Sequence, residues 1–336
     1  MTAAMTMLPA LCCSSSVDRK MSSLLPAVLF EPLSCGKRGF DDVNEHYFSR
    51  KSLTCWDKFY KRHQNKFFKD RHYLEKDWGK YFSDGDDGAI SANGKVLLEI
   101  GCGAGNTIFP LIAAYPKLFV HACDFSTEAL TLVKEHPNFN GDQINLFICD
   151  VANDELCEKI LPSSVDIVTL IFMLSAVSPK KMPFVLQNLK KVLKPNGHIL
   201  VRDYAVGDSA QVKLENKNQM ISNNFYFRGD GTCSFYFSED FLSALFVKAG
   251  FGTVDMNIYC RQVENRFRNM AFQRWDTASG SIVYDLMFSP SRLYSEYSSC
   301  LLFYSYFLMM SFLVLLCDLT HMVRRWIRAI FTKIDS

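Results

Sequence analysis

A glycine-rich turn between a buried strand and a helix constrains this chain more than any other feature. Residues 96–100, which follow Lys95, form an apolar run interrupted only by Glu99, which predicts a buried parallel strand. The run ends at Gly101, Gly103 and Gly105, before a new apolar pattern begins. Glycines allow a positive φ and a close approach to a ligand, and the N–H groups at a helix start favour an anionic or polar group. This strand, turn and helix predict a nucleotide-type cofactor site.

Two further predicted strands end in carboxylates, which supports a cofactor site. The strand at 118–124 ends in Asp124, about twenty residues after the glycines, where an acidic side chain can accept hydrogen bonds from both ribose hydroxyls. The strand at 144–150 ends in Asp150, which we expect to meet an adenine amino group. The pattern E-x-G-x-G-x-G resembles motif I of the class I S-adenosylmethionine-dependent methyltransferases. The resemblance implies a cofactor site made of Glu99, Gly101, Gly103, Gly105, Asn106, Asp124, Phe125, Asp150, Val151 and Ile171.

Composition limits the other classes of function. The chain has 336 residues, 49% of them hydrophobic, which is enough for one large domain with extensions or two small ones. Its formal charge of +2 gives no global basic field, so nucleic-acid contacts must come from local patches. The twelve cysteines show no paired C-x-x-C spacing, which indicates a reducing compartment and no structural zinc or other metal site.

The first segment, 1–40, is rich in serine and poor in acidic residues. This composition fits a disordered tail, and it also fits an organellar transit segment. Both interpretations stay open. We therefore expect a cytoplasmic protein, with a mitochondrion or another organelle as the alternative location.

An aromatic and basic block follows within residues 41–88. Its aromatic side chains alternate with Lys, Arg and His, a mixture suited to stacking on bases and contacting phosphates. The alternative is an amphipathic helix whose aromatic face packs on the domain while its basic face meets solvent. Both descriptions can hold together. The candidate substrate contacts in this block are Trp56, Tyr60, Lys61, Arg62, Lys66 and Arg71.

Two longer motifs make a family recognisable. Residues 56–72 read W-x-x-F-Y-x-x-H-x-x-x-F-F-K-D-R-H, and residues 223–232 read N-N-F-Y-F-R-G-D-G-T. With motif I, they resemble the tRNA N3-methylcytidine methyltransferases, the methyltransferase-like 2/6/8 group, over about residues 47–270. Cys233 departs from the family pattern, which usually has an arginine there, so one phosphate contact is in doubt.

The resemblance carries expectations about fold and function. It implies an α/β protein with a Rossmann-like, seven-stranded class I methyltransferase sheet, whose seventh strand is antiparallel, after an N-terminal helical extension. We expect the catalytic domain at 89–274 and methyl transfer from S-adenosylmethionine to N3 of a cytidine at position 32 of a tRNA anticodon loop. One family branch acts with seryl-tRNA synthetase, so such a helper is a candidate partner besides tRNA.

The chemistry of N3 methylation suggests the remaining site residues. Cytosine N3 already carries a lone pair, so the reaction needs orientation more than a strong base. A carboxylate can stabilise the positive charge that develops on the base, and Asp203 is the first candidate, with Asp230 the second. For stacking the extruded cytosine or holding phosphates, the candidates are Tyr204, Phe225, Tyr226, Arg202 and Arg228. The alternatives are core packing for the aromatic residues and an ion pair between Arg228 and Asp230.

The carboxyl end contains an apolar insert, 275–323, without a counterpart in the family. Residues 300–317 form an uncharged stretch of 18 residues followed by arginines, the minimum for a membrane helix. The final segment, 324–336, resembles the family's last strand, which a single membrane span would separate from its sheet. Three alternatives stay open: the last strand does not dock, the apolar stretch folds back, or the insert comes from a wrong gene model.

Two rival functions also stay open. A methyltransferase of this fold could act on a protein or a small molecule, although the aromatic and basic block argues against this. A non-catalytic scaffold, tethered to a membrane or bound to tRNA, is suggested by Cys233 and the apolar insert. The methyltransferase interpretation predicts that Glu99, Asp124 and Asp150 share one cavity with Asp203 at its mouth.

Overall fold

The computed structural model describes residues 38–83, 94–263 and 322–334. The predicted tail (1–40) and the predicted insert (275–323), including the apolar stretch 300–317, fall almost entirely outside these ranges. In the part of the chain that is described, no helix is long and apolar enough to cross a membrane. Apart from Arg38, the described residues belong to one unit, 39–336.

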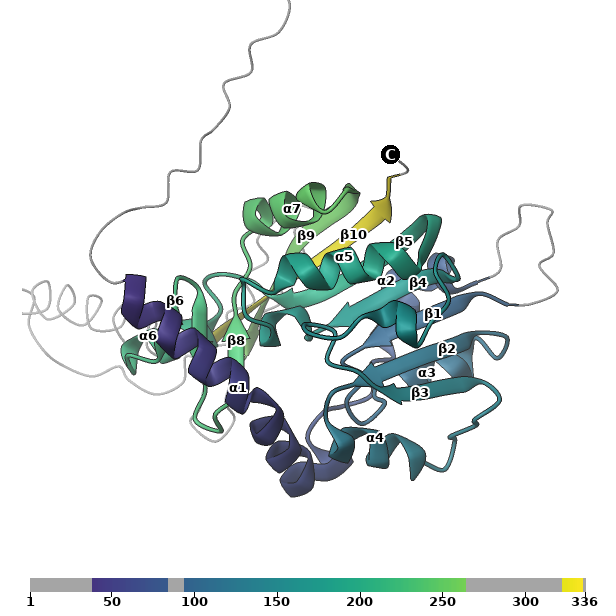
Figure 1. The fold of residues 1–336 in the computed structure, drawn as a ribbon, viewed down its shortest axis with the longest axis horizontal. Helices are drawn as coiled ribbons and strands as arrows, with labels where there is room; N and C mark the ends of the chain where they lie inside the picture. The colour runs from purple at the N-terminus through teal and green to yellow at the C-terminus, as the bar shows by residue number, and fades with distance from the viewer. Residues whose placement is uncertain (1–37, 84–93, 264–321, 335–336) are drawn as a thin grey trace, which may run out of the picture. The chain divides into compact units, whose positions relative to one another are not determined.

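A seven-stranded sheet forms the centre of the fold, with strand order β3-β2-β1-β4-β5-β10-β9 (Figure 1). Strands β1 to β5 run parallel to one another, whereas β10 runs antiparallel to both β5 and β9. This arrangement confirms the predicted α/β methyltransferase sheet and its antiparallel seventh strand. The strands are β1 (Val96–Ile100), β2 (Phe119–Asp124), β3 (Ile144–Ile148), β4 (Val165–Ile171), β5 (Leu193–Tyr204), β9 (Phe251–Val263) and β10 (Met322–Lys333).

Helices cover both faces of the sheet because each carries apolar residues at helical spacing. One apolar cluster packs α2, α3 and α4 against the sheet, and another packs α5 and α7 against the opposite face. Three short 3-10 turns lie at Gln64–Lys66, Leu156–Glu158 and Leu174–Ala176. The helices are α1 (Arg38–His63), α2 (Tyr73–Phe82), α3 (Ile108–Ala114), α4 (Thr127–Lys134), α5 (Met182–Val192), α6 (Ser209–Asn216) and α7 (Glu239–Lys248).

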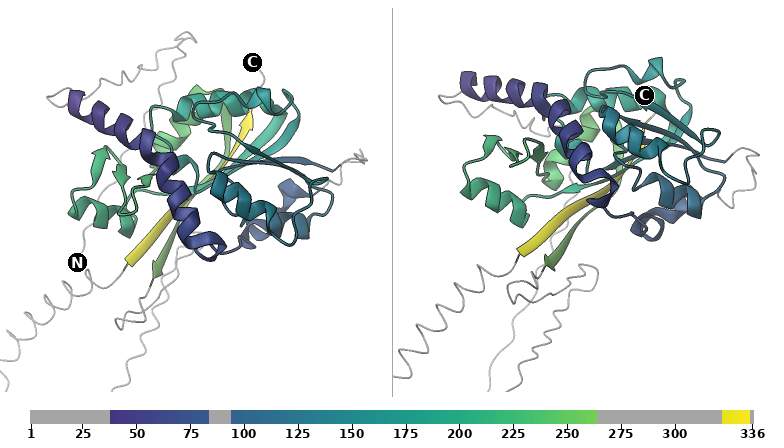
Figure 2. Two further views of the ribbon diagram at one scale, coloured as in Figure 1. Left: turned by 60° about the horizontal axis from the view of Figure 1, so that its bottom comes forward. Right: turned by 90° about the horizontal axis from the view of Figure 1, so that it is seen from below.

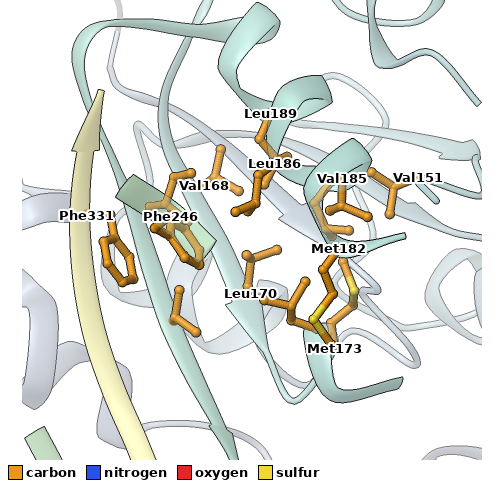
Figure 3. Close-up of a cluster of buried hydrophobic side chains, with 14 of the residues drawn as sticks. Val151, Val168, Leu170, Met173, Met182, Val185, Leu186, Leu189, Phe246 and Phe331 are labelled. Carbon is orange, nitrogen blue, oxygen red and sulfur yellow. The ribbon is translucent and has the colours of Figure 1, made fainter. Parts of the chain in front are cut away.

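The cluster under α5 and α7 shows why β10 belongs to the sheet (Figure 3). Val185, Leu186 and Leu189 of α5 are fully buried against β4. Further along, Phe246 of α7 stacks on Phe331 of β10, with ring centroids 3.7 Å apart and planes 9° apart. Both phenylalanines are fully buried. Removing β10 would therefore open the core and leave one edge of β5 unpaired.

The last two strands, β9 and β10, pair along their whole length, from Met322 opposite Val263 to Lys333 opposite Phe251. Docking of β10 rules out the alternative in which the last strand stays apart from the sheet. It also moves the boundary of the predicted insert, because residues 322 and 323 are already part of β10. The first residues of β10 pair only with β9, so the two strands project beyond β5 (Figure 2).

A second, smaller sheet was not predicted from the sequence. Strands β6 (Met220–Ser222), β7 (Phe225–Phe227) and β8 (Cys233–Phe235) are antiparallel and follow α6. Each strand has only three residues, too few for an apolar alternation to be recognised. The family motif at 223–232 therefore forms a strand and the turn that follows it.

Candidate functional site

The glycine turn has the backbone conformation that its sequence predicts. Gly101, Gly103 and Gly105 have φ values of 66°, 55° and 86°, which residues with a side chain rarely adopt. A Cβ atom on Gly103 would lie 2.6 Å from the hydroxyl oxygen of Tyr60, and one on Gly101 would overlap the side chain of Met173. The turn therefore needs glycine for its backbone shape and for the close approach of its neighbours.

Asp124 joins the end of β2 to this turn. Its Oδ2 atom accepts a hydrogen bond from the Gly103 N–H at 2.9 Å, and its Oδ1 atom accepts one from the Ser126 N–H at 2.9 Å. Burial raises the pKa of Asp124 to about 6. Each carboxylate oxygen still has a second lone pair, so the side chain can accept further bonds from ligand hydroxyls.

Asp150 lies two residues beyond the end of β3, in a turn that its own side chain closes. The Ala152 N–H donates to Oδ1 at 3.1 Å, and the Asn153 side-chain amide donates to Oδ2. The Asp150 N–H in turn donates to Oδ2 of Asp154 at 2.8 Å. The carboxylate is thereby fixed at the same edge of the sheet as Asp124.

A cavity of about 820 Å³, part of it open to solvent, lies at this edge. Its walls come from the ends of β1, β2 and β3, from the segment after β4, and from α1. A cavity with a close-approach turn and carboxylates at adjacent strand ends has the polar groups to hold an adenosyl group. The predicted cofactor residues that line it are Gly101, Asp124, Phe125, Asp150 and Val151.

The other predicted cofactor residues do not line the cavity and lie around it. Glu99 is fully buried beneath the turn, where the Thr169 hydroxyl donates to its carboxylate, and burial raises its pKa to about 7. The Asn106 side chain donates to Asp70 Oδ1 at 3.0 Å and so ties the turn to the N-terminal extension. Ile171 packs in the core, and the neighbouring Phe172 lines the cavity instead.

Helix α1 supplies one wall of the cavity, through residues that the sequence predicted to contact tRNA. Trp56 and Tyr60 line the cavity, and their rings are stacked 5.9 Å apart. Phe59 and Tyr60 are buried against Ala104 and Ala129, which follow β1 and β2. The helical spacing of these aromatic residues indicated one packed face. Only the structure shows that this face covers the cavity.

The opposite side of α1 is basic and exposed. Lys61 and Arg62 in the last turn of α1, and Lys66 in the 3-10 turn that follows, are exposed. Lys61 forms an ion pair with Glu128 at 3.0 Å. The packing interpretation therefore holds for the aromatic face, and contact of the exposed basic side chains with nucleic acid stays a prediction. Arg71 differs from these residues because it is half-buried and lies near Phe172.

Asp203 was expected at the mouth of the cavity but lies behind its wall. The carboxyl group is fully buried and accepts hydrogen bonds from the Ser175 N–H and the Tyr204 N–H, each at 2.9 Å. Burial raises its pKa to about 6. These bonds hold the turn that carries Met173 and Ala176, which line the cavity. Asp203 thus acts on the cavity through the main chain.

Asp230 lies in the exposed turn between β7 and β8. Its Oδ1 accepts hydrogen bonds from the Thr232 N–H at 2.9 Å and from the Thr232 hydroxyl at 2.6 Å. Arg228 donates to the same Thr232 hydroxyl at 2.9 Å, and its guanidinium lies 5.8 Å from the Trp56 ring centroid. The turn therefore links the small sheet to α1. Cys233 is buried beside it, so this position offers no exposed side chain to a phosphate.

The remaining predicted substrate contacts are mostly engaged within the protein. Phe225 and Tyr226 are buried, and the Tyr226 hydroxyl donates to Glu215 at 2.6 Å, which favours core packing over base stacking. Arg202 forms an ion pair with Asp77 at 2.7 Å across 125 residues of sequence. Tyr204 remains close to the cavity, with its ring 5.1 Å from that of Phe172.

No cluster of three or more His, Cys, Asp or Glu side chains within 38–83, 94–263 and 322–334 is arranged to hold a metal ion. The described cysteines are free thiols. The site that can be described from these residues is therefore built from backbone N–H groups, carboxylates and aromatic rings.

The chain is similar to several known proteins. The methyltransferase-domain family matches residues 98–199. A solved S-adenosylmethionine-dependent methyltransferase from Methanosarcina mazei is 15% identical, covering 73% of this chain and 94% of its own, with a TM-score of 0.47.

Curated relatives are more similar. Rat tRNA N(3)-cytidine methyltransferase METTL6 is 42% identical over 219 residues, which is 65% of this chain and 75% of that protein. The tRNA N(3)-methylcytidine methyltransferase trm141 of Schizosaccharomyces pombe is 38% identical over 229 residues, 68% of this chain and 90% of that protein. The chain therefore belongs to the family of tRNA N3-cytidine methyltransferases, whose cofactor is S-adenosylmethionine.

Proposed function

We propose that this protein transfers the methyl group of S-adenosylmethionine to N3 of a cytidine in tRNA, at position 32 of the anticodon loop. One observation carries the proposal: Trp56 and Tyr60, from the family-specific extension, line the same cavity as Gly101 and Asp124 of the general methyltransferase core. The residues that distinguish this family are thus part of the site where the methyl donor binds.

Each wall of the cavity has a role in holding the cofactor. Asp124 accepts hydrogen bonds from the ribose hydroxyls, and Asp150 meets the adenine amino group at the neighbouring strand end. Trp56 and Tyr60 cover the bound molecule and exclude water from it. The cofactor itself supplies an electrophilic methyl group, and the protein only has to orient it.

The target base needs a position more than a catalytic base. Tyr204, beside Phe172 at the edge of the cavity, is our candidate for stacking on the extruded cytosine. Asp203 positions the cavity wall through Ser175, and its buried negative charge stabilises the cationic product at neutral pH. We assign Asp230 to shaping the turn between β7 and β8.

The tRNA lies along the exposed basic side of α1 and the turn that follows, where Lys61, Arg62 and Lys66 face solvent. The family resemblance supports an additional protein partner such as seryl-tRNA synthetase, and action in the cytoplasm.

Methylation of defined tRNA transcripts by the purified full chain tests the proposal. We expect N3-methylcytidine, detected by nucleoside mass spectrometry, in a transcript with C32 and none in the same transcript with U32. The assay is repeated with seryl-tRNA synthetase, and a protein extract replaces tRNA as the control substrate. Methylation of the U32 transcript at another cytidine would refute the position, and methylation of protein instead of tRNA would refute the substrate.

A further inference from the structure

We propose that Arg71 binds the carboxylate at the methionyl end of S-adenosylmethionine. This assigns Arg71 to the cofactor, whereas its sequence context suggested a contact with RNA phosphate. The inference rests on the proposed use of the cavity for the methyl donor, but it does not depend on which base is methylated.

The main chain holds Arg71 against the glycine turn. The Arg71 N–H donates to the Asn106 carbonyl oxygen at 2.9 Å. The Asn106 side-chain amide donates in return to Asp70 Oδ1 at 3.0 Å and to the Phe68 carbonyl oxygen at 3.3 Å. These hydrogen bonds clamp residues 68–71 of the extension onto the start of the helix after the turn. The position of Arg71 relative to the cavity is therefore fixed.

The guanidinium group of Arg71 faces residues at one end of the cavity. Its Cζ atom lies 5.1 Å from the ring centroid of Phe172, which lines the cavity. The positive charge also opposes the effect of burial on the pKa values of Glu99 and Tyr60, so both side chains are close to it. Arg71 thus lies among residues that surround the Gly101 end.

One donor of this guanidinium is buried without a partner. The Nε–H of Arg71 makes no hydrogen bond, although Nη1 donates to the Tyr73 hydroxyl at 3.4 Å. Leaving a buried donor unpaired costs free energy, so such groups in native proteins are commonly satisfied by a ligand or by water. An anionic ligand at this end of the cavity would supply the missing acceptor.

Strand order predicts which part of the cofactor reaches Arg71. Asp150 follows β3, Asp124 ends β2, Gly101 follows β1 and Phe172 follows β4, and these four strands are consecutive in the sheet. A ligand with adenine at β3 and ribose at β2 therefore places its amino-acid end at β1 and β4. That end carries the carboxylate, which a guanidinium recognises with two parallel hydrogen bonds.

Two other cationic side chains near the cavity or the extension are less suitably placed to bind this carboxylate. Lys181 also lines the cavity, but its ammonium bonds to Asn153 at 2.5 Å, beyond the β3 end where we place adenine. Lys69 lies two residues before Arg71 and is exposed. Arg71 combines partial burial, an unpaired donor and a position at the amino-acid end.

The test compares two ligands that differ only in this carboxylate, namely S-adenosylmethionine and its decarboxylated form. Isothermal titration calorimetry on the full chain gives both affinities for the wild type, Arg71→Gln, Arg71→Lys and the control Lys69→Gln. We expect Arg71→Gln to lower the affinity for S-adenosylmethionine about tenfold or more and to leave the affinity for the decarboxylated ligand unchanged. Arg71→Lys should retain part of the affinity, and Lys69→Gln should bind both ligands like the wild type.

Two outcomes would overturn the assignment. An equal loss of affinity for both ligands would show that Arg71 only shapes the cavity. Unchanged affinity for both would show that Arg71 does not contact the cofactor. In the latter case, loss of tRNA affinity in the same variant would show that Arg71 contacts RNA, as its sequence context suggested. Thermal unfolding of each unliganded variant identifies a folding defect. Because neither ligand contains RNA, these results are independent of the methylation site in tRNA.

Discussion

The carboxyl ends of β1 to β3 and helix α1 form facing parts of one cavity, but they are held in place differently. At the strand ends, short hydrogen bonds such as that from Gly103 to Asp124 fix the polar groups. On α1, aromatic packing against Ala104 and Ala129 fixes Trp56 and Tyr60. The sheet edge is part of the general fold, whereas α1 belongs to the family-specific extension.

This difference explains how one site can serve a common cofactor and a particular substrate. The inner face of α1 touches the cofactor cavity, and the outer face presents basic side chains to solvent. The small sheet braces the helix, because Phe48 stacks on Phe227 with centroids 4.9 Å apart and Arg228 lies over Trp56. Substitutions on the strand ends, the inner face and the outer face should therefore have separable effects.

The largest effect is expected at the strand ends. Asp124→Ala should weaken S-adenosylhomocysteine binding about 1000-fold, or about 4 kcal/mol, because the ribose loses charged acceptors and two backbone N–H groups lose theirs. Calorimetric titration measures the affinity, with Asp142→Ala, an exposed carboxylate, as the matched control. A loss of less than tenfold would mean that α1 dominates cofactor binding.

The next prediction concerns pH and the buried carboxyl beneath the turn. Burial raises the pKa of Glu99 from 4.5 to about 7, so its contribution to the free energy of unfolding is present below pH 4.5 and is lost as the pH rises through 7. Relative to Glu99→Gln, the wild type should lose about 3 kcal/mol of stability between pH 4.5 and 8. Urea unfolding at several pH values measures this difference.

Parallel stability profiles for the wild type and Glu99→Gln would contradict the prediction. The same experiment tests the link between the two regions, because the positive charge of Arg71 in the extension lowers the pKa of Glu99. Arg71→Gln should therefore enlarge the loss of stability and extend it to higher pH.

The inner face of α1 should matter less than the strand ends. Trp56→Ala should weaken S-adenosylhomocysteine binding about 20-fold, or about 2 kcal/mol, because the cavity loses part of its aromatic cover. Tyr47→Ala, an exposed aromatic residue on the same helix, should leave the affinity unchanged. Equal effects of the two substitutions would show that α1 acts only through its general stability.

The outer face should affect tRNA and not the cofactor. Arg62→Glu combined with Lys66→Glu should weaken tRNA binding about tenfold at low salt and reduce the slope of log affinity against log salt by about 2. Fluorescence anisotropy with labelled tRNA gives both quantities. S-adenosylhomocysteine affinity is the internal control, and a change there would show that the two faces are not separable.

The smallest effect is expected in the small sheet. Tyr226→Phe removes hydrogen bonds to Glu215 and Gln211 and should lower the free energy of unfolding by about 1 kcal/mol. Denaturant unfolding measures this change. Affinity for tRNA should not change, since the hydroxyl is engaged within the protein. A selective loss of tRNA affinity would show that this hydroxyl contacts the RNA.

The sequence determined the sheet and the polar half of the cavity. Apolar runs marked β1 to β3 to within two residues, and their terminal residues could be assigned to one edge because parallel strands end on the same side. The fold of the glycine turn followed from Gly101, Gly103 and Gly105 alone, since local sterics set the backbone conformation.

Tertiary packing decided the rest. The spacing of Trp56 and Tyr60 indicated a packed face but not its partner, Asp203 could not be known to lie behind the cavity wall, and Arg202 pairs with Asp77 far away in the sequence. Local patterns report conformation and average burial. Which side chains meet across a cavity depends on contacts between distant segments, and these exist only after the elements pack.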